Sequence, residues 1–152
     1  MFESCHTPHD AAHLLRHRYG LPVELAALRP TVTCGSHISA VDMPAQLGYR
    51  VLDLLDERHP APAVANPRDT AWTFLVAPPQ PSTLLKPEQI RRFADHRVAV
   101  RSIGQRVMLP VSDRGHGWRW ASEPRRGTLR LPPRTAVLDA VERLIDGGEP
   151  SC

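Results

Sequence analysis

The sequence predicts an α+β domain whose core is a split βαβ unit of the ferredoxin-like or RRM-like kind, with a mostly antiparallel sheet. The 152 residues suffice for one domain with a substantial core. Segments of strand and helix character follow one another through the middle of the chain as strand, helix, strand, strand, helix, strand. Sixteen prolines punctuate the sequence, which indicates short elements and many loops.

Four helices are predicted from apolar periodicity and from the residues at their ends. Gly20 and Gly147 follow two of the periodic segments, where glycine commonly caps a helix. Pro44 and Pro87 stand at the start of the other two, where the missing N–H costs nothing. The predicted helices cover residues 8–19, 44–58, 87–95 and 134–146.

The strands are predicted from runs rich in β-branched and aromatic residues. The letters "NPRDT" between two of the runs are typical of a hairpin turn. Residues 21–30, interrupted by Pro22 and Pro30, are expected to be irregular. The predicted strands cover residues 31–42, 63–66, 71–77, 98–102, 106–110 and 118–122. We therefore expect a helix and lead-in over 1–30, the domain proper over 31–147, flanked by helices and one extra hairpin, and a disordered tail over 148–152.

Composition and charge exclude several classes of protein. No apolar run approaches the roughly 18–20 residues of a membrane span, and the N-terminus lacks the pattern of a signal sequence, so a cytoplasmic protein is expected. Three cysteines are too few and too scattered for a disulfide framework. The formal charge of +3 is weak evidence for a polyanionic partner. We expect no cofactor.

Asp42 ends a predicted buried strand two residues before Pro44, and two roles are open for it. Many enzymes place a catalytic acid at a strand end. A carboxylate just before a helix also accepts hydrogen bonds from the first helical N–H groups and suits the helix dipole. We favour the helix-capping role.

Histidines and cysteines near the N-terminus raise the question of a metal site. His9, His13 and His17 share one face of the first predicted helix. Cys5, His9, Cys34 and His37 are residue types that bind zinc. Their spacing is not that of a standard finger, so a solvated histidine face is favoured and no metal site is assigned.

The region 112–130 combines arginines with two tryptophans. Aromatic faces beside guanidinium groups suit stacking on bases and phosphate binding. The alternative is a hairpin in which Trp118 and Trp120, two residues apart and so on the same face of a strand, both pack into the core. The basic residues of this region are Arg114, His116, Arg119, Arg125, Arg126 and Arg130.

Four stretches together resemble a known family: "AVDMPAQLGYRVLDLL", "TAWTFLVAP", "VAVRSIGQRVMLPVS" and "GHGWRWASEP". In order and spacing they are similar to the N-terminal prim-pol domain of bifunctional DNA primase/polymerases, in the archaeo-eukaryotic primase superfamily. The resemblance covers roughly residues 31–140. It implies an RRM-like core in which acids hold two divalent metals that activate a 3′ hydroxyl, while a histidine contacts the nucleotide phosphates.

Transferred position by position, the resemblance implies a site that has lost its chemistry. Asp42 matches one acid of the first motif, but its partners would fall at Ser39 or Pro44. The histidine position falls near Ala71, and the third acid near Ala99. A lone carboxylate cannot hold two metals about 3.5–4 Å apart, so Asp42 is interpreted as a vestigial acid.

The leading hypothesis is therefore a non-catalytic prim-pol-like protein that binds DNA or a nucleotide near the degenerate cleft. The residues expected to bind are Arg101, Ser112, Arg114, His116, Arg119, Arg125 and Arg126. The alternative is a protein–protein interaction module in a regulatory or replication-associated complex, favoured if these arginines scatter or pair with Glu123, Asp139 or Glu142. A third hypothesis, residual nucleotidyl transfer, requires a second carboxylate within reach of Asp42.

Overall fold

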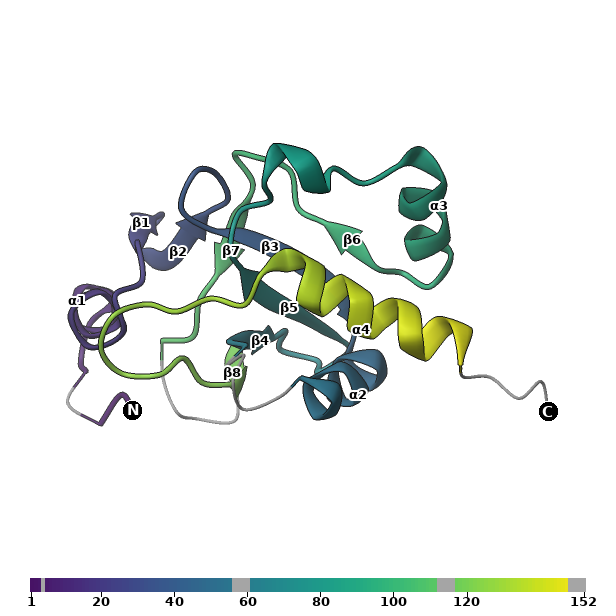
Figure 1. Ribbon diagram of the computed structural model, residues 1–152. Helices are drawn as coiled ribbons and strands as arrows, with labels where there is room; N and C mark the ends of the chain where they lie inside the picture. The colour runs from purple at the N-terminus through teal and green to yellow at the C-terminus, as the bar shows by residue number, and fades with distance from the viewer. Residues whose placement is uncertain (4, 56–60, 112–116, 148–152) are drawn as a thin grey trace.

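The computed structural model describes most of the chain and shows an α+β protein with two antiparallel sheets (Figure 1). The described residues are 1–3, 5–55, 61–111 and 117–147. The predicted tail 148–152 and three predicted site residues, Ser112, Arg114 and His116, lie outside them. None of the helices in the described part has the length and apolar character needed to cross a membrane.

Three of the four predicted helices begin and end where expected, and the fourth is shorter. Gly20 adopts φ +71° and closes α1, and Pro87 begins α3, as predicted. The helices are α1 (Pro8–Tyr19), α2 (Ala45–Leu54), α3 (Pro87–Asp95) and α4 (Arg134–Asp146), with a 3₁₀ turn η1 (Pro81–Thr83). The strands are β1 (Glu24–Ala26), β2 (Arg29–Thr33), β3 (Ser39–Pro44), β4 (Ala63–Ala65), β5 (Ala71–Val76), β6 (Ala99–Val100), β7 (Arg106–Met108) and β8 (Arg119–Ser122).

The five-stranded sheet confirms the predicted split βαβ core. Its strand order is β6-β3-β5-β4-β8, with every neighbouring pair antiparallel. The first four of these strands, numbered by chain order within the β3–β6 unit, lie in the order 4-1-3-2. That order results from two crossover connections: α2 joins β3 to β4, with β5 between them, and α3 joins β5 to β6, with β3 between them. The strand β8 extends the sheet beyond β4.

The prediction of one strand over 31–42 is wrong. The chain leaves β2 at Thr33, turns, and enters β3 at Ser39, and the two strands belong to different sheets. The N–H of Gly35 donates to the carbonyl of Ile38 across this turn (2.9 Å). The polar letters "CGSH" are the sequence signal for the break.

The prediction that residues 21–30 are irregular holds for residues 21–23 and is wrong for residues 24–30. Residues 24–30 form β1 and the start of β2, joined by a two-residue turn at Ala27 and Leu28 whose φ values are 50° and 64°. Positive φ at both positions is typical of a type I′ hairpin, usually built with Asn-Gly. Because Ala and Leu replace those residues here, the turn carries no recognisable sequence signature.

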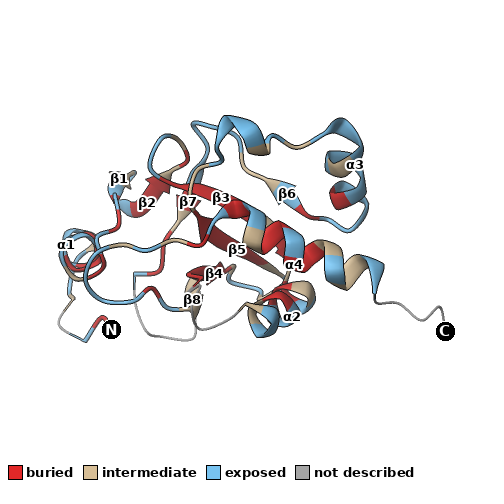
Figure 2. Cartoon of the chain, viewed as in Figure 1, coloured by how far each residue is buried: buried red, intermediate tan, exposed pale blue. Residues whose placement is uncertain are grey.

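Two hydrophobic cores lie on opposite faces of the five-stranded sheet, so its central strands are buried on both sides (Figure 2). Alternate residues of β5 belong to different cores: Phe74 packs beneath α2 and α4, and Leu75 packs toward α1 and the three-stranded sheet β1-β2-β7. In β3, Val41 faces the helices α2 and α4, and Ala40 faces α1. Side chains two residues apart in a strand point to the same face, so Asp42, like Ala40, lies on the α1 side of the sheet.

Candidate functional site

Asp42 lies in β3, between β5 and β6, and its carboxylate binds one side chain from each side. Thr73, directly opposite in β5, donates its hydroxyl to Oδ1 at 2.6 Å. Arg101, just after β6, donates Nε to Oδ2 at 2.8 Å and Nη1 to the carbonyl of Arg106 at 2.6 Å. The carboxylate is thus held by one neutral and one charged donor, and it stabilises the junction of β3, β5 and β6.

The predicted helix-capping role of Asp42 is wrong. The residue before α2 is Pro44, and no side chain caps the helix. Asp42 is still paired within β3, where its side chain points along the sheet normal rather than toward the helix axis. The strand continues two residues beyond Asp42, which moves the helix N-terminus out of its reach.

The residues around Asp42 do not fit a pair of divalent metals. Its register neighbours are Thr73 and Ala99, neither of which carries a charge, and the nearby cation is Arg101. Within the described residues, no group of three or more His, Cys, Asp or Glu side chains is placed to hold a metal ion. A guanidinium already occupies the position beside the carboxylate that a cation would need.

The predicted binding arginines that the structure describes, Arg101, Arg119, Arg125 and Arg126, do not converge on one cleft. Arg101 lies at the β6 edge of the five-stranded sheet, and Arg119 lies in β8 at the opposite edge. Arg119 forms an ion pair with Asp69 (2.8 Å), which also accepts from Nε1 of Trp72 (3.1 Å). Trp118 and Trp120 are partly buried against the core on the α1 side, as the inward-packing alternative predicts.

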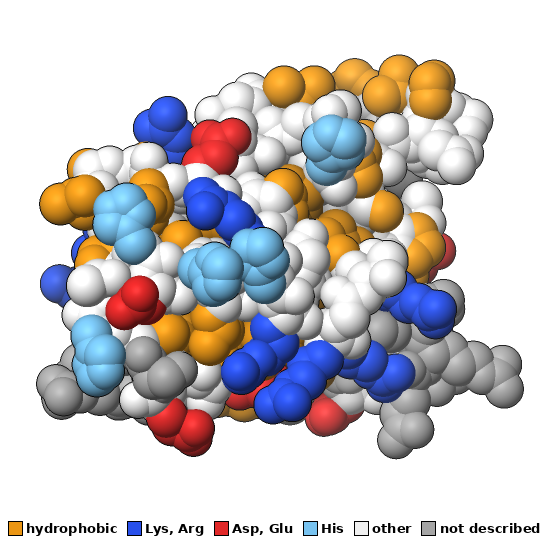
Figure 3. Space-filling model, turned by 90° about the vertical axis from the view of Figure 1, so that its left-hand side faces the viewer, with side chains coloured by type: hydrophobic (Ala, Val, Ile, Leu, Met, Phe, Trp, Pro, Cys, Tyr) orange, Lys and Arg blue, Asp and Glu red, His pale blue; other side chains and the backbone are white. Residues whose placement is uncertain are grey.

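Arg125 and Arg126 lie elsewhere, against the end of α1. The N–H of Gly127 donates to the carbonyl of Arg18 at 2.9 Å and docks residues 125–130 on the last helical turn. Figure 3 shows Lys and Arg side chains gathered in one region of this face, below neighbouring histidines. We call the following group the α1 basic surface: Arg16, Arg18, Arg125, Arg126 and Arg130.

The histidines form an exposed face of α1, as predicted. The rings of His13 and His17 lie 4.0 Å apart, while Leu14 and Leu15 on the other face are buried. A shallow pocket of about 480 Å³ lies along this face, lined by Cys5, Asp10, His13, Leu14, His17 and Arg18. The histidines therefore border the α1 basic surface.

Cys34, a member of the possible zinc set, is buried between the two sheets. Burial raises the pKa of its thiol, an effect opposed by the nearby Arg101 guanidinium. A buried thiol with a raised pKa is a poor nucleophile and a poor ligand. His37 is exposed on the turn that follows Cys34.

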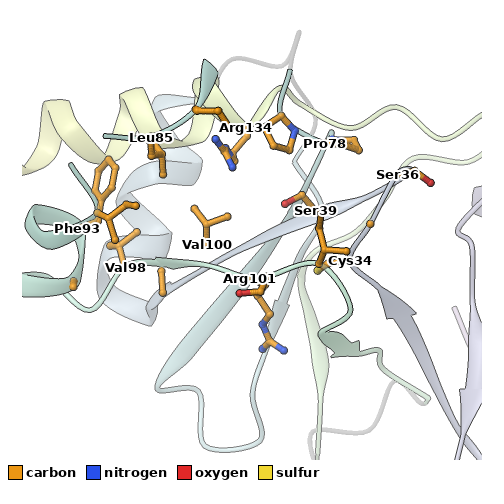
Figure 4. Close-up of a pocket in the computed structure, with 18 residues that line it drawn as sticks. Cys34, Ser36, Ser39, Pro78, Leu85, Phe93, Val98, Val100, Arg101 and Arg134 are labelled. Carbon is orange, nitrogen blue, oxygen red and sulfur yellow. The ribbon is translucent and has the colours of Figure 1, made fainter. Parts of the chain in front are cut away.

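A larger pocket, of about 1030 Å³, lies on the helix-covered side between β6, α3 and the start of α4 (Figure 4). Its apolar wall includes Leu85, Phe93 and Val98. The Arg134 guanidinium and the Ser39 hydroxyl face its interior, whereas the Arg101 guanidinium points away from it. The pocket and the Asp42 carboxylate therefore lie on opposite faces of the sheet.

Three of these residues escaped the sequence analysis. Thr73 is an ordinary strand threonine in the sequence, and Asp69 belongs to a turn motif. Arg134 carried the clearest signal: it is a cation in the first turn of a predicted helix, where the helix dipole disfavours positive charge.

Comparisons with models of known protein families, with curated proteins and with solved structures give no match.

Proposed function

We propose that the chain is a non-catalytic prim-pol-like protein that binds DNA through the α1 basic surface. One observation carries the proposal: the Gly127–Arg18 hydrogen bond places three exposed arginines of the segment 125–130 against a helix turn that itself carries Arg16, His17 and Arg18. Arginine side chains bind phosphate oxygens with strong charge-assisted hydrogen bonds. The proposal moves the binding surface from the sheet, where the sequence predicts it, to the end of α1.

The form of the surface favours a polymer over a mononucleotide. The neighbouring pocket along α1 is shallow, and the arginines are spread along a helix turn and an adjacent segment. Such an arrangement suits a row of phosphates, each neutralised separately. A mononucleotide would need a concave site with convergent polar groups.

The environment of Asp42 supports the absence of catalysis. In the resemblance to prim-pol domains, the third acid falls near Ala99, and Ala99 is the register partner of Asp42. An acid at that position would therefore lie beside Asp42 on the same face of the sheet. Alanine stands there, and Arg101 neutralises the remaining carboxylate.

The test is fluorescence anisotropy of labelled single- and double-stranded DNA at several salt concentrations. Binding should weaken steeply with salt, and each lost duplex phosphate contact should reduce the slope of log K against log salt by about 0.9. Arg126→Glu and Arg130→Glu should each weaken binding. Arg50→Glu, an exposed charge reversal on α2, is the matched control and should have little effect.

Two outcomes would contradict the proposal. Flat anisotropy at tens of micromolar protein would remove DNA as the ligand, and equal losses for Arg50→Glu and Arg126→Glu would show that only net charge matters. The alternative of a protein–protein interaction module is favoured by two observations: the predicted binding arginines among the described residues scatter, and Arg119 pairs with Asp69. Absence of DNA binding together with capture of a defined partner would support that alternative.

A further inference from the structure

The large pocket beside α4 contains an arginine without a counter-ion. Arg134 is only 8% exposed, yet no carboxylate of the described residues forms an ion pair with it. Its Nη2 donates to the carbonyl of Thr83 at 3.0 Å, and its Nε is buried without a hydrogen-bond partner among the described residues. Burying a cation without a counter-ion destabilises the folded protein, and a bound anion that pairs with the guanidinium would offset this cost.

The local backbone adds to the positive potential at this position. Arg134 is the first residue of the 13-residue helix α4, and no side chain caps that end. The positive end of the helix dipole and the guanidinium therefore lie together. Asp139 and Glu142 of α4 line a smaller, adjoining pocket that Arg134 also lines, but neither carboxylate forms an ion pair with it, and Glu142 accepts from Nε2 of Gln89 (3.4 Å).

The rest of the pocket is mainly apolar and includes unusually exposed residues. Leu84, Ile90 and Ile103 are 73%, 53% and 87% exposed, and all three line this pocket. Exposed large aliphatic side chains that line one pocket indicate a binding site rather than chance exposure. Figure 4 shows Leu85, Phe93 and Val98 at one end of the pocket, away from Ser36 and Cys34 at the other, with Arg134 and Ser39 between them.

We propose that this pocket binds a small amphipathic carboxylate, whose charged group pairs with Arg134 and whose apolar body lies against Leu85, Phe93 and Val98. The volume, about 1030 Å³, is at the upper end of the range for small-molecule sites. A carboxylate offers acceptor oxygens to a guanidinium in its preferred planar geometry. The Ser39 hydroxyl, buried in the floor, supplies a further donor.

The probe for the first experiment is decanoate, titrated calorimetrically into the full chain, with decanol and decyltrimethylammonium as neutral and cationic comparisons. Decanoate should bind at one site, and the two comparison compounds should bind about tenfold more weakly or not at all. Absence of decanoate binding at about 1 mM would overturn the proposal. Equal binding of decanoate and decanol would overturn the role of Arg134.

Variants separate the charged and apolar parts of the site. Arg134→Gln should weaken decanoate roughly tenfold and leave decanol unchanged, while Arg134→Lys should retain much of the affinity. Because a buried arginine can matter for folding, Ile90→Ser and Ile103→Ser provide a second test at exposed positions, and both should weaken decanoate. Leu28→Ser, an equally exposed aliphatic on the β1–β2 turn, is the control and should have no effect.

A second copy of the chain is the competing occupant of the apolar opening. In that case sedimentation should show a dimer that Ile90→Ser dissociates, and decanoate should not bind to the dimer. That result would overturn the small-molecule proposal. Neither result depends on DNA binding, because the pocket and the α1 basic surface involve different residues.

Discussion

Replacement of Asp42 by alanine should destabilise the protein, and the size of the loss follows from its two partners. The Thr73 hydroxyl, in a residue only 5% exposed, would lose a charged acceptor, which costs about 1.5–3 kcal/mol. The ion pair with Arg101 is partly exposed, with side-chain exposures of 24% and 33%, so it adds only about 0.2–1 kcal/mol. Water can partly replace the one-third exposed carboxylate, so a net loss of about 2–3 kcal/mol is expected.

The assay is urea unfolding followed by circular dichroism, together with the melting temperature. For a chain of this length the loss corresponds to a decrease in Tm of roughly 4–12 °C. The matched control is Asp53→Ala, an exposed aspartate on α2, which should change stability by less than about 0.5 kcal/mol. The double variant Asp42→Ala/Thr73→Val should be less destabilised than the sum of the single variants, because both remove the same hydrogen bond.

An unchanged or increased stability of Asp42→Ala would refute this reasoning. Residues retained for ligand binding or catalysis often reduce stability, so their removal tends to raise it. A gain in Tm would therefore indicate that Asp42 is retained for chemistry. A loss of stability of the expected size would instead support a structural role for Asp42.

Three further predictions concern the frame around these sites. Gly48→Ala should destabilise by about 1–2 kcal/mol in urea unfolding, because overpacking against the buried Trp72 ring, 2.6 Å from the new Cβ, outweighs the gain in helix propensity; a more stable variant would contradict the close packing of α2. The His6 backbone N–H lowers the pKa of the Asp10 carboxyl in the folded state, so its contribution is present above about pH 4 and is lost as the pH falls through the lower folded-state pKa. Asp10→Asn should remove that part of the acid-side loss in a pH titration of stability, and an unchanged titration would argue against the capping box of α1. Cys34 should resist iodoacetamide in the native protein and react in urea, as mass spectrometry of the labelled peptide can show, because burial raises the pKa of its thiol and shields the sulfur; rapid native labelling would refute its burial.

Helix ends were predictable because their signals are local. Pro87 begins α3 and Gly20 ends α1 through effects within one helical turn. The bounds of α1 and α3 were therefore predicted to the exact residue. The break between β2 and β3 was missed because the five residues between Thr33 and Ser39, which include Ile38, are flanked on both sides by β-favouring residues. The two strands fall in different sheets because β2 pairs with β7, which is distant in the sequence.

The partners of the site residues were not predictable, because they are distant in sequence. Thr73 lies 31 residues and Arg101 59 residues from Asp42, and only the strand order brings the three together. The same holds for residues 125–130, which reach Arg18 through a connection outside any strand or helix. Residue type predicted that these arginines bind something, but the fold determines which of them stand together.

The distribution of charge separates the proposed DNA-binding surface from the position of Asp42. At the two edges of the five-stranded sheet, Arg101 binds Asp42, and Arg119 binds Asp69. Those guanidiniums contribute little potential to an approaching phosphate, because their fields are largely cancelled at close range. Two other places concentrate positive charge: the α1 basic surface gathers several arginines, and Arg134 is buried without a counter-ion among the described residues. We therefore expect anions to bind most favourably at these two places. Substitutions can remove either site and leave the other intact.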